Sequence, residues 1–387
     1  MKTIKAGVIG TGFIGPAHVE ALRRIAGVEV LAVGSIEPER GRELAERFDI
    51  PRVYDRWEPL VADPDIEVIH NCTPNSLHYA INRAAILAGK HIISEKPLTV
   101  NSRQSGELLR LLRKSRSVHA VNFNYRFYPL VQEARAMVDG GKLGKIFLVH
   151  GHYLQDWLYY PTDYNWRLEP DAGGASRAVA DIGAHWLDLV QFITGLKIRR
   201  LCADLVTIHP SRQKPASAVQ TFKGKESEAG AAGPSVRIRT EDAGNLLLEF
   251  EGGARGVLTV SQVSAGRKNC EAFEIDGSLC ALAWNQEEPN RLWVGNRGGP
   301  NEILIKDPSL LSPSARRYAH YPGGHPEGYP EGPMNLFMNV YDFIRAGKDP
   351  RTARADFPTF EDGHWENLLV EAALRSNRSR KWTAVKE

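Results

Sequence analysis

Short apolar runs alternate with helix-like segments over the first 125 residues. The apolar runs are AGVIG (6–10), VEVLAVGS (28–35), IEVIHNC (66–72), HIISEK (91–96) and VHAVNF (118–123). The segments between them, HVEALRRI, ERGRELAERF, SLHYAINRAAILAG and SRQSGELLRLLRKS, repeat apolar residues with helical spacing. Strands that alternate with helices in this way are typical of a parallel sheet wrapped by helices. The pattern predicts a doubly wound parallel α/β domain over residues 1–125.

The pattern changes over residues 126–387, where strand-like runs are longer and few helices separate them. These runs are KIFLVHGHYL, IRRLCADLVTI, AGNLLLEFE, ARGVLTVSQVS, CEAFEIDG and RLWVG. Gly-containing turns between them favour a large open, mostly antiparallel sheet in a second α/β domain. Residues 209–234, rich in Pro, Gly, Ser, Ala and Lys, are expected to be a mobile surface insertion. The terminal amphipathic helix, 360–378, is expected to pack back on the first domain.

The length and charge of the chain limit the classes of function. A chain of 387 residues is longer than a single hydrophobic core usually supports, so two domains are expected. The net charge of +3, from 49 basic and 46 acidic residues, gives no sign of nucleic-acid or anionic-membrane binding. No apolar stretch has the length of a membrane span or the layout of a signal peptide, so we expect a cytoplasmic protein.

A glycine-rich turn follows the first apolar run. Gly10, Gly12 and Gly15 are spaced as G-x-G-x-x-G between a predicted strand and a predicted helix. The first glycine permits the tight turn, the second lets the backbone approach a pyrophosphate, and the third lets helix and strand pack closely. The helix N-terminus then favours an anion through its free N–H groups. We therefore expect a dinucleotide at this turn.

The end of the second strand bears on the choice of cofactor. Enzymes that use NAD usually place Asp or Glu there to bind the ribose hydroxyls. This chain has Ser35, followed by Glu37 and Arg40. Because no acid stands at the end of the strand, Ser35 and Arg40 can donate hydrogen bonds to the 2′-phosphate of NADP. Glu37 can instead bind the ribose hydroxyls of NAD. We expect NAD(P) as cofactor, with NADP slightly favoured over NAD.

The stretch ADIGAHWLDL (180–189) carries two acids and an imidazole. In a helix, Asp181, His185 and Asp188 lie on one face. That face can be a proton-transfer site, a metal site or the polar edge of an amphipathic helix. An imidazole that titrates near neutrality suits a general base, and Asp181 one turn earlier can orient it. No third ligand has a metal-site spacing, so no metal is expected.

Five motifs occur in order along nearly the whole chain: GVIGTGFIG, NCTPNSLHYA, AGKHIISEKPLT, VNFNYRFYP and GGASRAVADIGAHWLDL. Together they resemble the Gfo/Idh/MocA family, named for glucose-fructose oxidoreductase, inositol dehydrogenase and a rhizopine-catabolism protein. The resemblance implies an N-terminal Rossmann domain, a C-terminal domain with a large open sheet, and hydride exchange between NAD(P) and a sugar, anhydrosugar, glycoside or polyol. It also implies a small-molecule carbohydrate substrate and a homodimer or homotetramer formed through the open sheet.

The resemblance also implies roles for single residues. The catalytic group is Lys96, Asp181 and His185. The cofactor contacts are Gly10, Gly12, Phe13, Ile14, Gly15, Ser35, Arg40, Thr73, Pro74, Asn75, His78, Glu95, Lys96 and Asn124. The substrate contacts are Lys96, Tyr125, Arg126, Trp166, Arg167, Asp181 and His185, joined by His325 and Tyr329 from a Gly/Pro-rich stretch.

Other functions compete with simple hydride transfer. Some relatives oxidise a sugar transiently with bound NAD, cleave a glycosidic bond and reduce the product again. A dinucleotide sensor would need no proton-transfer residues, yet Lys96, Asp181 and His185 are all present. A metalloenzyme would need a third ligand beside Asp181 and His185. The sequence favours a dehydrogenase or reductase acting on CH–OH groups.

Overall fold

A computed structural model of the protein describes residues 3–215 and 233–386. The N-terminal sheet has six parallel strands in the order β3-β2-β1-β4-β5-β6. They are β1 (Ile4–Ile9), β2 (Val28–Gly34), β3 (Arg52–Tyr54), β4 (Val68–Asn71), β5 (His91–Ser94) and β6 (His119–Val121). The connecting helices are α1 (Ile14–Arg23), α2 (Pro38–Arg47), α3 (Trp57–Ala62), α4 (Asn75–Leu87) and α5 (Ser102–Leu112). The prediction of a doubly wound parallel sheet is confirmed.

The C-terminal sheet has nine strands in the order β16-β15-β14-β13-β7-β12-β11-β8-β17. They are β7 (Ile146–Leu154), β8 (Ile198–Val206), β11 (Ala243–Phe250), β12 (Arg255–Ser261), β13 (Cys270–Gly277), β14 (Ala281–Asn285), β15 (Arg291–Gly295), β16 (Glu302–Ile305) and β17 (Thr383–Ala384). Each neighbouring pair is antiparallel except β7 and β12, which are parallel. The prediction of a large, mostly antiparallel second sheet is confirmed.

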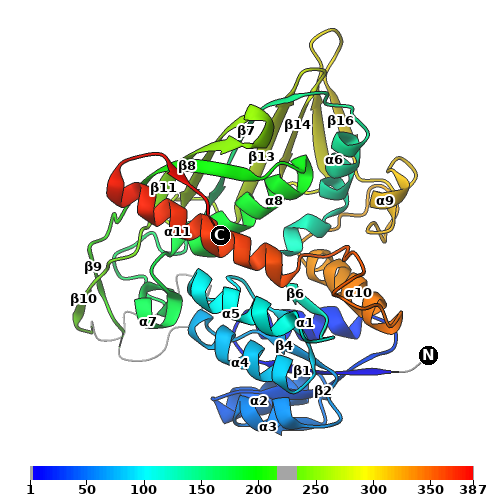
Figure 1. The fold of residues 1–387 in the computed structure, drawn as a ribbon, viewed down its shortest axis with the longest axis vertical. Helices are drawn as coiled ribbons and strands as arrows, with labels where there is room; N and C mark the ends of the chain where they lie inside the picture. Colours follow the sequence, from blue (N-terminus) through cyan, green and yellow to red (C-terminus); the bar gives the residue numbers. More distant parts are fainter. Residues whose placement is uncertain (1–2, 216–232, 387) are drawn as a thin grey trace.

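Helices cover one face of the large sheet. Helix α8 (Ala184–Thr194) packs with α6 (Pro129–Asp139) and α11 (Phe360–Ser379) over this face (Figure 1). Shorter elements connect the parts: η1 (Asn124–Phe127), η2 (Trp166–Leu168), α7 (Pro170–Gly173), η3 (Val179–Gly183), η4 (Glu251–Gly253) and α9 (Pro313–Arg316). The buried side of the strands follows the two-residue alternation of a half-covered sheet, as Leu246, Leu248 and Phe250 of β11 show.

Two late helices join the two sheets. Helix α10 (Glu331–Arg345) places Leu336, Phe337 and Val340 in the core of the first sheet. Helix α11 runs past α5, where Ser102 donates to the carboxylate of Glu371 through its backbone N–H at 2.7 Å and its Oγ at 2.8 Å. Segments from the C-terminal part of the chain thus complete the core of the first sheet.

The stretch 209–234 differs in part from the predicted mobile insertion. Strand β9 (Ser211–Gln213) pairs with β10 (Ser235–Arg237), and Arg212 is almost fully buried. Its guanidinium donates to the backbone oxygens of Leu158, Tyr160 and Asp163 at 2.6–3.0 Å. The buried guanidinium of Arg212 therefore anchors residues 209–215. The polar composition of this stretch gave no indication of that contact. Residues 216–232 of the predicted insertion lie outside the described residues.

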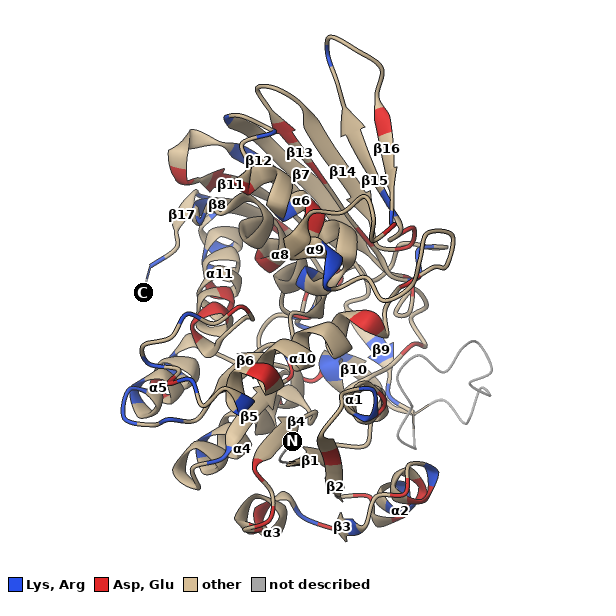
Figure 2. Ribbon diagram, turned by 90° about the vertical axis from the view of Figure 1, so that its right-hand side faces the viewer, with Lys and Arg blue, Asp and Glu red and all other residues tan. Residues whose placement is uncertain are grey.

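Charged residues are distributed over the molecule. Figure 2 shows basic and acidic positions interspersed along the helices and strands of both sheets. This distribution agrees with the small net charge of the sequence. Among residues 3–215 and 233–386, no helix has both the length and the apolar character needed to cross a bilayer.

Candidate active site

The glycine turn joins β1 to α1 in the conformation that its glycines require. Gly10 has a φ of 107°, and a Cβ there would lie 2.4 Å from the oxygen of Cys72. A Cβ at Gly15 would lie 2.0 Å from the oxygen of Gly10. A Cβ at Gly12 would meet nothing within 4 Å. Gly10 and Gly15 thus serve backbone packing and Gly12 leaves space over the N-terminus of α1, so the turn fits a dinucleotide pyrophosphate.

The tip of β2 carries a local hydrogen-bond network. Ser35 Oγ lies 2.8 Å from Thr11 Oγ1, donates to the backbone oxygen of Glu37 at 2.9 Å and accepts from its N–H at 3.1 Å. Arg40 Nε lies 3.0 Å from the carboxylate of Glu37. Ser35 and Arg40 are therefore close together near the glycine turn, but Glu37 holds both in this structure.

Lys96 and Asp181 meet between the two sheets. Lys96 follows β5 and precedes a cis peptide bond to Pro97, and Asp181 lies in η3. Lys96 Nζ donates to the backbone oxygen of Asp181 at 2.7 Å and to its Oδ1 at 3.0 Å. Arg167 Nε donates to the same Oδ1 at 3.2 Å. Burial alone would raise the pKa of Asp181, but Lys96 and Arg167 hold it well below the usual range.

Arg167, which donates to Asp181, also contacts the ring of Trp166. Its guanidinium lies over the ring of Trp166, 4.4 Å from the centroid. A cation over an aromatic ring is stabilised by the ring quadrupole. The structure thus brings together Lys96, Asp181, Arg167 and Trp166, all four of which the sequence motifs indicated.

His185 stands beside this group with its ring packed among aromatic side chains. The ring centroid lies 4.9 Å from that of Tyr125 and 5.9 Å from that of Phe123, both edge-on. Its Nδ1 is buried and has no hydrogen-bond partner among the described residues. Burial, reinforced by the charge of Lys96, lowers the pKa of His185 to about 3. The imidazole is therefore neutral at physiological pH.

The expected pairing of Asp181 with His185 is not what the structure shows. Residues 179–183 form a π-helical turn before α8, a feature frequent at functional sites. Within the described residues, the carboxylate of Asp181 accepts from Lys96, Arg167 and Gln262 and makes no hydrogen bond to His185. Asp181 thus orients cations, whereas aromatic packing orients the imidazole. We refer to Lys96, Arg167, Asp181 and His185 as the Lys96 cluster.

The charge state of His185 can be measured. Its ring should stay neutral from pH 8 to pH 5, because the pKa is depressed below the unfolded value of about 6.5. Nitrogen NMR of ring-labelled protein, assigned with His185→Asn, should show no protonation of His185 in this interval, and free histidine in the same buffer, with a pKa of about 6.5, serves as the control. A midpoint near pH 6.5 for His185 would contradict the structure.

A buried ionic network behind Asp181 was not indicated by any sequence motif. Gln262 Nε2 donates to Asp181 Oδ2 at 2.8 Å, and Gln262 Oε1 accepts from Arg177 Nη1 at 2.8 Å. Arg177 and Arg212 both pair with Oδ1 of Asp242. Because a guanidinium only donates, the amide oxygen of Gln262 must face Arg177, and its NH₂ must face Asp181. Arg177 thereby fixes the orientation of a donor to Asp181.

The rings of Tyr125 and Tyr153 both contact the ring of His185. Tyr125 and Tyr153 place their hydroxyl oxygens 2.8 Å apart, and Asn269 donates to Tyr125 at 2.9 Å and accepts from Tyr153 at 2.7 Å. Burial and nearby Glu95 raise the pKa of Tyr329. Tyr125 was predicted, whereas Tyr153 and Asn269 were missed because an isolated polar residue in a strand or turn carries no motif.

The structure corrects the placement of Arg126 and His325. Arg126 donates from Nε to Asp188 at 2.7 Å and from Nη2 to Asp362 at 2.9 Å, in an ion pair under α11. The side chain of His325 is exposed, with its Nδ1 3.2 Å from the oxygen of Gly323. Carboxylates from later helices hold Arg126, and local loop geometry holds His325, so neither contacts the Lys96 cluster within the described residues.

The side chains of the expected cofactor segment after β4 are hydrogen-bonded within the segment and to backbone oxygens of two other segments. His78 is fully buried, and its ring nitrogens lie 2.7 Å from the oxygen of Pro97 and 2.8 Å from that of Thr73. Thr73 Oγ1 donates to Asn71 at 2.7 Å, and Asn75, next to Pro74, donates to the oxygen of Gly173 at 2.9 Å. His78 therefore joins this segment to the one after Lys96.

Two other expected cofactor residues are buried. Asn124 lies beside Gly332 of α10, and its Nδ2 has no partner among the described residues. Glu95 accepts from Asn122 at 2.5 Å and lies 2.9 Å from His18 Nε2. Phe13 and Ile14 begin α1, and the Phe13 side chain is exposed. The first two side chains thus pack inside the domain, whereas Phe13 faces outward at the turn.

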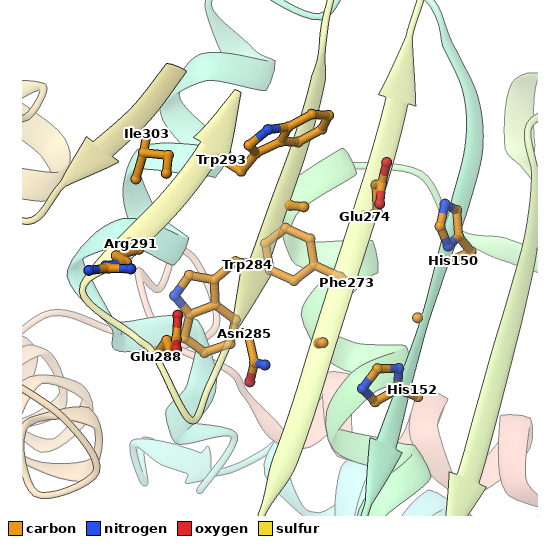
Figure 3. A pocket seen from close by; sticks show the side chains of 13 residues that line it. His150, His152, Phe273, Glu274, Trp284, Asn285, Glu288, Arg291, Trp293 and Ile303 are labelled. Carbon is orange, nitrogen blue, oxygen red and sulfur yellow. The ribbon is translucent and has the colours of Figure 1, made fainter. Parts of the chain in front are cut away.

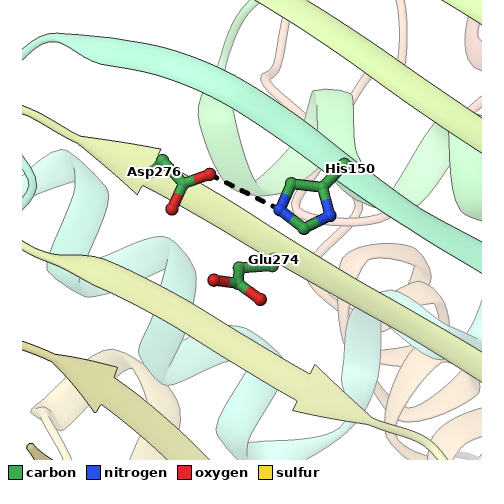
Figure 4. Close-up of side chains that lie close together, drawn as sticks. All are labelled: His150, Glu274 and Asp276. Carbon is green, nitrogen blue, oxygen red and sulfur yellow. Dashed lines mark ion pairs between the residues drawn. The ribbon is translucent and has the colours of Figure 1, made fainter.

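The uncovered face of the large sheet contains a separate hollow. Its walls include His150, Glu274, Trp293 and Ile303, which come from neighbouring strands (Figure 3). On the same face, the ligand atoms of His150, Glu274 and Asp276 lie within 4.8 Å of one another (Figure 4). His150 Nε2 is 3.5 Å from Asp276, and both side chains are partly exposed. No comparable set in the described residues adds a third metal ligand to Asp181 and His185.

Comparison with known proteins gives two family matches that lie end to end. Residues 4–123 match the model of an oxidoreductase family with an NAD-binding Rossmann fold, and residues 131–282 match the GFO/IDH/MocA C-terminal domain. Levoglucosan dehydrogenase of Pseudarthrobacter phenanthrenivorans is 29% identical over 409 aligned positions, which cover 100% of this chain and 99% of that protein.

Solved structures agree over the full length. An oxidoreductase domain protein from Kribbella flavida has a TM-score of 0.88 and 30% identity, with complete coverage of both chains. Levoglucosan dehydrogenase in complex with NADH and L-sorbose has a TM-score of 0.88 and 28% identity, covering 99% of each chain. An Azotobacter vinelandii inositol dehydrogenase homolog with NADH and myo-inositol gives 0.85 and 28%, covering 99% of this chain and 98% of that one. The chain therefore belongs to the Gfo/Idh/MocA family of oxidoreductases.

Proposed function

We propose that the protein is an NAD(P)-dependent dehydrogenase or reductase that acts on a secondary alcohol of a sugar, anhydrosugar, glycoside or polyol. The observation that carries the proposal is the position of the Lys96 cluster. Gly10 follows β1 and Lys96 follows β5, so both stand at the carboxyl edge of one parallel sheet, where cofactors bind in such folds. Relatives solved with NADH and L-sorbose or myo-inositol support the substrate class.

The residues supply the proton chemistry of such a reaction. When bound, a nicotinamide cofactor supplies the hydride acceptor or donor. Lys96 Nζ uses two of its three hydrogens on Asp181, which leaves the third for the reacting oxygen of the substrate. Neutral His185 accepts the hydroxyl proton during oxidation and returns it during reduction. Asp181 holds the ammonium group in place and balances its charge.

A screen by nicotinamide absorbance tests this function. Monosaccharides, anhydrosugars, glycosides and inositols would each be incubated with NAD and with NADP. We expect at least one polyhydroxylated substrate to release reduced cofactor in proportion to oxidised product. Cleavage of a glycoside with the cofactor retained and no net reduction would contradict a simple dehydrogenase, and would indicate redox-assisted cleavage instead.

For the cofactor, we propose that both forms bind and that NADP is slightly favoured. Ser35 offers no negative charge to repel a 2′-phosphate, and Arg40 can exchange Glu37 for that phosphate. Arg40→Ala should therefore weaken NADP binding more than NAD binding, by about 1.5–3 kcal/mol for a lost charged hydrogen bond. Glu37→Gln, which releases Arg40, should shift the preference toward NADP. Calorimetry on all three proteins measures this, and a wild type that prefers NAD by more than about tenfold would contradict it.

We also propose that the protein forms a homodimer or homotetramer through the uncovered sheet face. This face carries exposed apolar side chains, including Leu148, Leu247, Val257 and Ile303. Apolar surface of this kind is typical of contact sites between subunits. Light scattering coupled to size-exclusion chromatography should give a mass of two or four chains. A mass of 43.0 kDa, that of one chain, would contradict the proposal.

A further inference from the structure

Three polar side chains of the first domain are completely buried and have no role in the chemistry above. They are His18 of α1, His70 of β4 and Tyr341 of α10, each with an exposed fraction of 0%. The rings of His18 and His70 pack against Phe337, with centroids 4.7 and 4.9 Å away. A buried polar group without a hydrogen-bond partner destabilises the fold. The partners of these three side chains therefore indicate what the side chains do.

The three side chains form a hydrogen-bonded line that ends at Glu95. Tyr341 Oη lies 3.1 Å from His70 Nε2, and His70 Nδ1 lies 3.0 Å from His18 Nδ1. His18 Nε2 lies 2.9 Å from Glu95 Oε1. The line therefore connects a helix from the C-terminal half of the chain to the residue that precedes Lys96.

The partners determine where the hydrogens lie. The carboxylate of Glu95 only accepts, so His18 Nε2 must carry a hydrogen. Burial and nearby His18 lower the pKa of His70 well below its usual value, so this ring is neutral. When His18 is neutral, its Nδ1 accepts from His70 Nδ1–H, and His70 Nε2 accepts from the Tyr341 hydroxyl, so each nitrogen in the line has a partner.

We propose that His18 is a positioning residue that holds Glu95 as a carboxylate at the cofactor site, and that His70 and Tyr341 fix the tautomer of His18. The proposal rests on the proposed function, since Glu95 lies between β5 and Lys96, at the carboxyl edge of the parallel sheet where the cofactor is proposed to bind. Burial alone would raise the pKa of Glu95, but His18 and Lys96 lower it to about 2. A carboxylate beside the nicotinamide favours the positively charged oxidised ring over the neutral reduced ring.

Infrared spectroscopy of the protein without cofactor tests the line directly. A protonated carboxyl group has a C=O band that a carboxylate lacks, and Glu95→Gln identifies the contribution of Glu95. This assignment is needed because burial raises the pKa of Glu271 and Glu366, which contribute to the same region. At pH 7 the wild type should show no Glu95 band. His18→Met should show one, which the double variant His18→Met/Glu95→Gln removes, and His18→Gln, which keeps a donor, should restore the carboxylate.

Cofactor binding gives a second readout, with a matched control. His18→Met should lower the preference for oxidised over reduced cofactor by about tenfold, and Tyr341→Phe should lower it in the same direction by a smaller factor. Tyr318→Phe removes another buried hydroxyl beside α10, bonded to Asn339 and outside the line, and should leave the ratio unchanged. If His18→Met does not fold, Tyr341→Phe decides the question, because it removes a single oxygen atom.

The outcomes separate the two proposals. An unchanged Glu95 band in His18→Met, or an unchanged affinity ratio in Tyr341→Phe, overturns the positioning role. A wild type that binds neither cofactor overturns the proposed function, while the infrared result on Glu95 still decides whether His18 holds its charge.

Discussion

Replacing Lys96 by Met should lower turnover by at least about 100-fold, since loss of one hydrogen-bond donor to an oxygen that develops negative charge costs about 10²–10³ in rate. Lys96 Nζ is the cation that reaches Asp181 from the cofactor-binding sheet, and its remaining hydrogen can reach a substrate oxygen. Met has a similar length and no charge. Asp181 keeps Arg167 and Gln262 as donors in the variant, so the site should otherwise persist.

The measurement separates chemistry from binding. Cofactor affinity, followed by calorimetry, should change little in Lys96→Met, whereas the rate of nicotinamide reduction should collapse. Asp181→Asn serves as a graded control, because it retains one oxygen acceptor for Lys96 and should cost less than loss of the ammonium group. Turnover near the wild-type rate in Lys96→Met would remove this residue from the chemistry.

The largest effect on stability is expected for Asp242→Ala. The carboxylate of Asp242 is completely buried and pairs with Arg177 and Arg212, which are buried with it. Breaking a buried pair by removal of one partner typically costs about 3–5 kcal/mol, because an uncompensated charge remains inside. Here two guanidinium groups are left. The free energy of unfolding in urea should fall by at least this amount, and activity should fall as well, because Arg177 orients Gln262 toward Asp181.

A surface carboxylate supplies the control for this change. Asp204 pairs with Arg380 and is largely exposed, so Asp204→Ala should leave the free energy of unfolding almost unchanged. Burial would raise the pKa of Asp242, but Arg177 and Arg212 lower it below the usual value. The stability that this carboxylate contributes is therefore present above the unfolded pKa of about 3.9 and is lost as the pH falls below it. Equal losses in the two variants would contradict the assignment.

Local patterns were sufficient to predict much of the fold. The strands β1, β2, β4, β5 and β6 were visible because each is an apolar run beside a helix with clear periodicity. Strands β3, β14 and β16, of 3–5 residues, were not identified from the sequence. The glycine turn was visible because its requirements are local: a positive φ at Gly10 and close packing at Gly15.

The sequence by itself determined the two-sheet architecture, the glycine turn and the presence of Lys96, Asp181 and His185, since each of these depends on neighbouring residues or on ordered motifs. The tertiary structure alone decided which partners these side chains have. Asp188 binds Arg126 across 62 positions, Arg177 binds Asp242 across 65, and His70 meets Tyr341 across 271. It also decided the charge of His185, because burial among aromatic rings from distant segments sets the pKa of that imidazole. A pKa depends on the surroundings of a group in space, and those surroundings are not encoded in its neighbours along the chain.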